Sequence, residues 1–240
     1  MQKHTTNAIW FSSPNICLLE LVSASGMSQI ILDIEHGIFD LKETDAFILT
    51  AKSLGITVHA KTLAPEMSPI QQMLDLGADS VIIPHVGDID HAQYACAFSK
   101  YPPSGTRSSA GGRTRGYGSG GSNHYDEQNA QTKCYPMIET DEALHDIDKI
   151  LALDYVDGVF IGPTDLALSQ GGRVYSFNDK DKQNITKIAL AAQKAGKTWI
   201  MPAWSEPERI FSQQLGVGFM VTAHEHGILF AGLKQCTNSK

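Results

Sequence analysis

Two acidic side chains stand just after short apolar runs of the sequence. Glu139 directly follows the run from Tyr135 to Ile138, and Asp165 comes shortly after the run from Val159 to Ile161. If these runs are neighbouring parallel strands, they lie about 4.8 Å apart, and the two carboxylates repel each other unless a cation lies between them or one is protonated. Oxygen ligands without cysteine favour Mg²⁺ or Mn²⁺, with water completing the coordination. The alternative is that each acid begins the helix after its strand.

A histidine and a lysine follow two earlier runs of the same kind. His36 comes shortly after the run from Ile30 to Leu32, and histidine is the usual general base near neutral pH, although a lone histidine can equally be structural. Lys61 follows a weaker run, Thr57 to Ala60, and could bind a carboxylate, supply a Schiff-base amine or form an ordinary ion pair. The segment His224-Glu225-His226 follows a later run, with a spacing that also occurs by chance in loops.

The apolar runs recur along the chain and alternate with amphipathic stretches. They are near-continuous, as expected of strands buried on both faces of a parallel sheet. Several amphipathic stretches end in glycine before the next run, which is typical of helix ends: Gly26, Gly55, Gly77, Gly196 and Gly216. Eight candidate strands that alternate with helices predict a (β/α)8 barrel, whose active sites lie at the carboxyl ends of the strands. An open doubly wound sheet is the alternative, but no GxGxxG phosphate-binding pattern follows the first candidate strand.

The composition is that of an ordinary soluble globular protein. The 240 residues carry 26 Asp and Glu against 19 Lys and Arg, a net charge of −7, which argues against nucleic acid or an anionic membrane as the main partner. The four cysteines are scattered and form no CxxC pair, as in a protein with reduced thiols. No signal peptide and no apolar run of ~20 residues, the length of a membrane helix, is present. We expect one barrel domain over residues 1–240, in the cytoplasm.

One long Gly/Ser-rich segment, residues 104–122, interrupts the alternation between the fourth and fifth strand units. It reads SGTRSSAGGRTRGYGSGGS and carries Arg107 and Arg113. One interpretation is a disordered surface loop. The other is an active-site or subunit-contact loop that supplies positive charge, so that Arg107 and Arg113 would bind an acidic substrate.

Several segments resemble the HpcH/HpaI aldolase family. They are ILDIEHG at 31–37, QQMLDLGADSVIIPHV at 71–86, YPPSGTR at 101–107, and the tract that ends MIETDEALHDIDKILALDYVDGVFIGPTDLAL at 137–168. The likeness covers about residues 8–223. Members are (β/α)8 barrels, often hexameric, that use a divalent metal without a Schiff base to cleave 2-keto-4-hydroxy acids reversibly to pyruvate and an aldehyde. The resemblance thus implies a metal-dependent aldolase, a carbon–carbon lyase, that is a homo-oligomer, hexamer or trimer, with a small keto acid and an aldehyde as partners.

The resemblance also implies roles for the acidic residues and the histidine. Glu139 and Asp165 match the ligands of Mg²⁺ or Mn²⁺, and Asp33 and Glu35 match residues that hold metal-bound waters. His36 matches the family's catalytic base.

Further positions match residues that surround the substrate in the family. Asp75 matches the carboxylate that orients the base, and Trp10 matches an aromatic of the pocket wall. The carboxylate of pyruvate would be bound by the backbone around Gly162, Pro163, Thr164 and Asp165.

Three departures from the family's pattern concern the substrate pocket. Lys61 stands where the family has an arginine that contacts the keto oxygen, and Met137 stands where a glutamine is frequent. The segment His224-Glu225-His226 replaces small residues and an aspartate. Two alternatives to the aldolase therefore stay open: a condensing enzyme like the citrate synthase of siderophore biosynthesis, and a keto-acid-binding barrel without catalysis.

Overall fold

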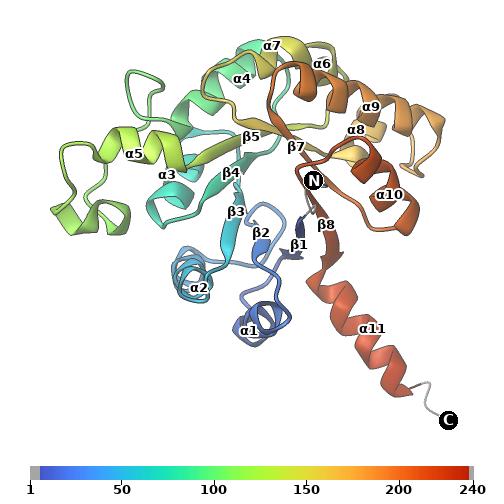
Figure 1. Ribbon diagram of the computed structural model, residues 1–240, viewed down its shortest axis with the longest axis horizontal. Coiled ribbons are helices and arrows are strands. Elements are labelled where there is room, and N and C mark those ends of the chain that lie inside the picture. Colours follow the sequence, from blue (N-terminus) through green and yellow to red (C-terminus); the bar gives the residue numbers. More distant parts are fainter. Residues whose placement is uncertain (1–5, 238–240) are drawn as a thin grey trace.

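The computed structural model describes residues 6–237, which form a closed barrel of eight parallel strands in chain order, with helices around it (Figure 1). The predicted (β/α)8 fold is confirmed, and every predicted run is a strand. The strands are β1 (Thr6–Phe11), β2 (Gln29–Asp33), β3 (Thr57–Lys61), β4 (Ser80–Ile83), β5 (Lys133–Ile138), β6 (Gly158–Ile161), β7 (Thr198–Pro202) and β8 (Phe219–His224).

The helices begin at local sequence signals. In α2, α9 and α10 an Asp, Asn or Ser side chain caps the first turn, and an acidic residue three positions later binds back to the cap. The α-helices are α1 (Ile16–Ala24), α2 (Leu41–Ser53), α3 (Met67–Asp75), α4 (Ile89–Cys96), α5 (His124–Gln131), α6 (Asp141–His145), α7 (Ile147–Leu151), α8 (Pro163–Ser169), α9 (Asp179–Lys194), α10 (Glu206–Gln214) and α11 (Glu225–Thr237), and the 3₁₀ turns are η1 (Ala97–Ser99) and η2 (Arg113–Gly118).

Alternate residues of each strand divide the core into two layers. Ile9 and Phe11 of β1 belong to the larger layer, between the barrel and its helices. Ala8 and Trp10 belong to the smaller layer inside the barrel, with the buried Ile31, Ile82, Tyr135, Met137, Phe160, Ile200, Phe219 and Val221. The barrel is therefore filled by side chains below its mouth, and a substrate must bind at the carboxyl ends of the strands.

The connections divide between the two ends of the barrel. Loops that follow strands lie at the carboxyl end, and loops that follow helices lie at the amino end. The segment 104–122 follows α4 and η1 and leads into β5, so it belongs to the amino end. Figure 1 shows it and α5 extending from one side of the molecule.

The last helix, α11, leaves the barrel. It follows β8 directly and points away from the other helices (Figure 1). Beyond Glu225 its described side chains are exposed, including the apolar Ile228, Leu229, Phe230 and Leu233. A lone helix of this length is marginally stable in water, so this apolar surface is suited to contact with another chain. None of the helices within residues 6–237 has the length and apolar character needed to cross a membrane.

A histidine lies inside the barrel, in the layer near its amino end. His59 of β3 is buried, its Nε2–H donates to Gln29 Oε1 at 3.1 Å, and its Nδ1 accepts from the Ser80 hydroxyl at 2.7 Å. The ring stacks on Phe219 with 4.5 Å between centroids. Burial lowers the pKa of His59 from 6.5 to about 4, because the charged ring would lose its hydration. His59 is therefore neutral in the folded protein at neutral pH.

His59 should make folding sensitive to mild acid. As the pH falls below 6.5, His59 binds a proton in the unfolded chain, but in the folded chain it does so only near pH 4. The free energy of unfolding therefore falls over this interval, by about 2 kcal/mol between pH 7.5 and pH 5. We expect His59→Gln to lose about 2 kcal/mol less than the wild type over that range. Urea unfolding at both pH values measures this difference. Equal losses in the two proteins would contradict the assignment.

Candidate active site

Five predicted site residues gather at the carboxyl ends of the strands. Trp10 lies near the end of β1, Asp33 ends β2, Lys61 ends β3, Glu139 follows β5, and Asp165 lies in the first turn of α8, which follows β6. In the β-sheet register, Asp33 is paired with Lys61 and Trp10 with Ile31. The closed barrel therefore brings together residues that are far apart in the sequence.

Glu35 is the carboxylate on which three side chains of this region converge. Its Oε2 lies 2.5 Å from the Lys61 ammonium, and its Oε1 lies 2.6 Å from His85 Nε2 and 3.5 Å from His36 Nε2. Burial alone would raise the pKa of Glu35, but Lys61 and His85 outweigh it and hold that pKa below its ordinary value. Glu35 is thus an ionised group at neutral pH, in contact with cationic or hydrogen-bond-donating side chains.

Asp33 ties the first two strands to the loop that carries His36. It is 3% exposed, its Oδ2 accepts from the Trp10 indole N–H at 3.0 Å, and its Oδ1 accepts from the backbone N–H of His36 at 3.1 Å. Lys61, itself 5% exposed, lies 4.0 Å from Oδ1 and above the Trp10 ring. The loop turns so tightly at Gly37 that a Cβ there would lie 2.1 Å from the Asp33 carbonyl oxygen. The base predicted at His36 is therefore held in place through its backbone.

Glu139 and Asp165, which the sequence predicts to act as an acidic pair, follow the neighbouring strands β5 and β6. Glu139 is 4% exposed and its Oε1 accepts from the backbone N–H of His85 at 2.5 Å. Its Oε2 faces Gly162, where a Cβ would lie only 2.9 Å from that oxygen. Burial raises the pKa of Glu139, and the negative charge of Asp165 acts in the same direction, against the opposing effects of His85 and Lys61. A divalent cation would relieve this repulsion.

The acidic pair fits a small, hard cation. The absence of a side chain at Gly162 lets Glu139 Oε2 keep its position, since a Cβ there would lie 2.9 Å from that oxygen. Asp165 is exposed. No group of three or more His, Cys, Asp or Glu side chains placed to hold a metal occurs within residues 6–237. Mg²⁺ is commonly bound by one or two carboxylates and keeps several waters, so two carboxylates suit it better than a cation that needs a full protein cage.

Two arginines and an aspartate predicted for the site lie at the other end of the barrel. Asp75 ends α3, which leads back to the start of β4, and its Oδ1 accepts from Arg107 Nη2 at 2.6 Å. Arg107 is buried against the Tyr101 ring, and Arg113 binds the Leu76 carbonyl oxygen. The prediction that Arg107 and Arg113 bind substrate is therefore wrong for the site of their own chain, and Asp75 does not orient His36 within one chain. The physical reason is that the loop of Arg107 and Arg113 follows a helix and Asp75 ends one, so all three residues lie at the amino end of the barrel.

The segment His224-Glu225-His226 belongs to the mouth of its own barrel. His224 lies beside Trp10 in the register of β8 and β1, and its Nε2 is 3.1 Å from Ser12 Oγ. His224 Nδ1 accepts from the backbone N–H of His226 at 3.3 Å, so the neutral ring carries its proton on Nε2 and donates to Ser12. Burial and His226 lower the pKa of His224. Ser12 is therefore not activated as a nucleophile, and the segment acts as a wall of the mouth.

Buried Glu225 fixes that wall to the first loop. Its Oε1 accepts from the backbone N–H of Ser12 at 2.7 Å, and the Ser12 carbonyl oxygen accepts from Ile38 at 2.8 Å. Ser12 and His85 are the residues of the mouth to which sequence reasoning gave no role. Both follow a strand, β1 and β4, and this position is the signal that could have identified them.

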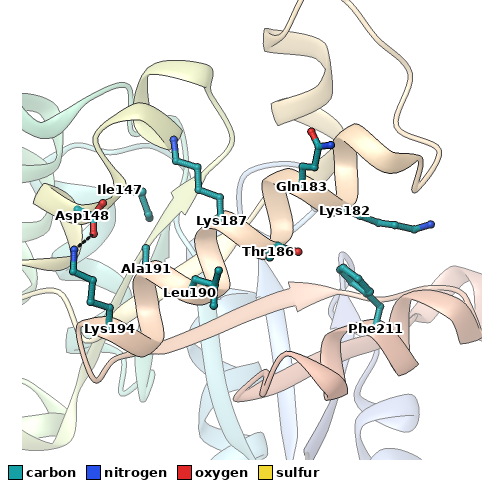
Figure 2. Close-up of a pocket in the computed structure, with 10 residues that line it drawn as sticks. All are labelled: Ile147, Asp148, Lys182, Gln183, Thr186, Lys187, Leu190, Ala191, Lys194 and Phe211. Carbon is teal, nitrogen blue, oxygen red and sulfur yellow. Dashed lines mark hydrogen bonds and ion pairs between the residues drawn. The ribbon is translucent and has the colours of Figure 1, made fainter.

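A separate hollow of about 660 Å³ lies on the outer wall (Figure 2). Its lysines stand on α9, and one of them, Lys194, pairs with Asp148 at 3.2 Å. None of the predicted site residues lines it, so it is not part of the candidate active site. The lining residues are Ile147, Asp148, Lys182, Gln183, Thr186, Lys187, Leu190, Ala191, Lys194 and Phe211.

Removing the buried ammonium should destabilise the mouth. We expect Lys61→Met to cost about 3 kcal/mol of unfolding free energy, because it leaves Glu35 and Asp33 buried without their cation. The same change at the half-exposed Lys52, which pairs with Asp79 on the surface, should cost less than about 1 kcal/mol.

A double variant tests whether the loss comes from the unpaired carboxylate. Adding Glu35→Gln to Lys61→Met should recover at least about 1 kcal/mol relative to the sum of the single changes. Urea unfolding of the four proteins gives this coupling energy. Additive losses would show that Lys61 contributes packing and not charge.

Comparison with known proteins identifies the family. The family model described as HpcH/HpaI aldolase/citrate lyase matches residues 7–211. The chain is 35% identical over 164 residues to a hydroxypyruvate/pyruvate aldolase of Sagittula stellata, a match that covers 68% of this chain and 64% of that protein's length. It is 32% identical over 190 residues to the enzyme of the same name from Roseobacter denitrificans, covering 78% of this chain and 74% of the relative.

A solved structure shows the same fold. The citrate synthase SbnG superposes with a TM-score of 0.86 at 23% identity, over 97% of this chain and 91% of that one. The matched family model, together with the Roseobacter relative, leads to one conclusion: the chain belongs to the HpcH/HpaI aldolase/citrate lyase family.

Proposed function

We propose that the protein is a divalent-metal-dependent aldolase that reversibly cleaves a 2-keto-4-hydroxy acid to pyruvate and an aldehyde. The observation that carries this proposal is the buried Glu139 beside Asp165 at the same barrel mouth as Lys61, Glu35 and His36. The family and the aldolase names of the relatives support the reaction class.

Glu139 and Asp165 would hold Mg²⁺ or Mn²⁺, with Asp33 and Glu35 binding waters of its coordination shell. When bound, such an ion would supply a Lewis acid for negative charge on the keto oxygen of pyruvate. The backbone N–H groups of Thr164 and Asp165, in the first turn of α8, would bind the pyruvate carboxylate, because the N–H groups of a first turn have no partner within the helix.

His36 is the proposed base. Its side chain is 67% exposed at the mouth, and its Nε2 lies 3.5 Å from Glu35 Oε1. In cleavage it would accept the proton of the C4 hydroxyl, so that the bond between C3 and C4 breaks and the aldehyde leaves. The electron pair of that bond would form the enolate of pyruvate, which becomes pyruvate when C3 takes up a proton. In the reverse direction a methyl proton of pyruvate is removed. Trp10 would form a wall of the pocket.

Lys61 would provide a fixed positive charge rather than an amine nucleophile. Its ammonium lies 2.5 Å from Glu35 Oε2 and 4.0 Å from Asp33 Oδ1, so it is paired with two carboxylates. A Schiff base needs the neutral amine. This arrangement supports metal-dependent chemistry without a covalent intermediate.

Metal-dependent exchange of the pyruvate methyl protons tests the proposal. We expect exchange with deuterium, followed by NMR, in the presence of Mg²⁺ or Mn²⁺ and its loss with a chelator. Asp165→Ala should reduce the rate at least about 100-fold, and His36→Asn a similar amount. Exchange that persists in Asp165→Ala would disprove the site. Release of CoA from acetyl-CoA and oxaloacetate, without pyruvate exchange, would instead favour a condensing enzyme.

A steric variant gives an independent check on the acidic pair. Gly162→Ala brings a Cβ to 2.8 Å from Glu139 Cβ and 2.9 Å from its Oε2, so the carboxylate must move and exchange should fall at least about tenfold. Gly121→Ala is the matched control, since nothing lies within 4 Å of the added Cβ. Unchanged exchange in Gly162→Ala would mean that the position of Glu139 does not matter.

We also propose that the protein is a homo-oligomer in which α11 contacts another copy. The exposed apolar side chains of this protruding helix support the proposal. Leu233→Glu should shift the mass in solution, measured by light scattering, toward the monomer, because a charge cannot be buried there without a partner. Lys234→Glu, on the same helix, is the control for charge alone. A wild-type protein that is monomeric at micromolar concentration would contradict the proposal.

A further inference from the structure

His85 adopts a backbone conformation that is uncommon for residues other than glycine. Its φ is 57°, in the left-handed region, where a side chain with a Cβ is disfavoured. Pro84 before it and Val86 after it are both buried, so the chain is fixed on either side. Backbone strain of this kind persists only where the surroundings enforce it, and it is frequent at functional sites.

The residue contacts two carboxylates of the candidate site at once. Its backbone N–H donates to Glu139 Oε1 at 2.5 Å, and its Nε2 lies 2.6 Å from Glu35 Oε1. The imidazole is 64% exposed, whereas the N–H reaches a carboxylate that is almost fully buried. The loop is also tied to the next one, since Thr140 Oγ1 donates to the Gly87 carbonyl oxygen at 3.1 Å.

The backbone contact decides which oxygen of Glu139 is available. Because Oε1 is bound by the His85 N–H, the oxygen that remains is Oε2, which faces Gly162 and the first turn of α8 that carries Asp165. With a negative φ at position 85, the chain could not keep its N–H on Glu139 and bury Val86 at the same time.

We propose that His85 is a positioning residue whose left-handed backbone aims Glu139 Oε2 at the metal position shared with Asp165. The inference rests on the proposed function, because it assigns Glu139 and Asp165 to a divalent cation. The proposed positioning acts through the peptide N–H at 2.5 Å. The imidazole contacts Glu35 at 2.6 Å, and its Nδ1 lies 3.7 Å from Glu139 Oε1.

Substitutions at position 85 separate the backbone from the side chain. Glycine adopts the left-handed conformation freely, whereas alanine is disfavoured there and valine more so, and none of the three carries an imidazole. We expect His85→Gly to bind Mn²⁺ within about threefold of the wild type, His85→Ala about fivefold more weakly than His85→Gly, and His85→Val at least about tenfold more weakly. His85→Asn, which tolerates this conformation, should resemble His85→Gly.

The measurement is Mn²⁺ binding to the full-length protein by EPR, without substrate, with circular dichroism to verify folding. The comparison of His85→Gly with His85→Ala decides the matter if His85→Val does not fold. Equal affinity of these two variants, whether both strong or both weak, would overturn the proposal, since backbone conformation would then not control the ligand. Absence of Mn²⁺ binding in the wild type would instead overturn the metal site of the proposed function, and this inference with it.

Discussion

The contact of the Lys61 ammonium with Glu35, close to the buried Asp33, is the interaction on which the candidate site depends. Three carboxylates, those of Asp33, Glu35 and Glu139, lie at one end of the barrel largely out of water. Charges of one sign can be buried together only when a cation compensates them. Lys61 does this for the first two. Burial raises the pKa of Glu139, and the peptide N–H of His85 and the charges of Lys61 and His85 only partly oppose this effect.

This division of charge suits the proposed chemistry. The fixed cation, Lys61, can orient an anionic substrate. The pair Glu139 and Asp165 has no such cation, so in the proposed chemistry it would bind the divalent metal ion. Lys61 stands where the resemblance to the family implies an arginine. It binds Glu35 as a compact charge and cannot form a planar two-point contact with substrate. The substitution therefore keeps the electrostatics of the mouth and changes its hydrogen-bonding geometry.

The barrel's polarity explains the one incorrect group of site predictions. Arg107 and Arg113 are charged residues in a long glycine-rich loop, a combination typical of active sites. Their loop, however, follows a helix, and only loops that follow strands reach the mouth. The order of apolar runs and helices in the sequence already shows that this loop follows a helix. From that order the two arginines could have been placed at the amino end, where Arg107 pairs with Asp75. The same rule, applied to His85, would have included it.

The sequence by itself determined the fold and the family, and it predicted the acidic pair. Near-continuous apolar runs, glycine-terminated helices and the tract around Glu139 and Asp165 are local patterns, and each is set by residues close in the chain. The tertiary structure decided what no local pattern encodes: that Lys61 and His85 meet on Glu35, that Asp75 faces Arg107 rather than His36, and that His85 turns left-handed to reach Glu139. These contacts join residues from different strands and loops, so they exist only once the barrel has closed.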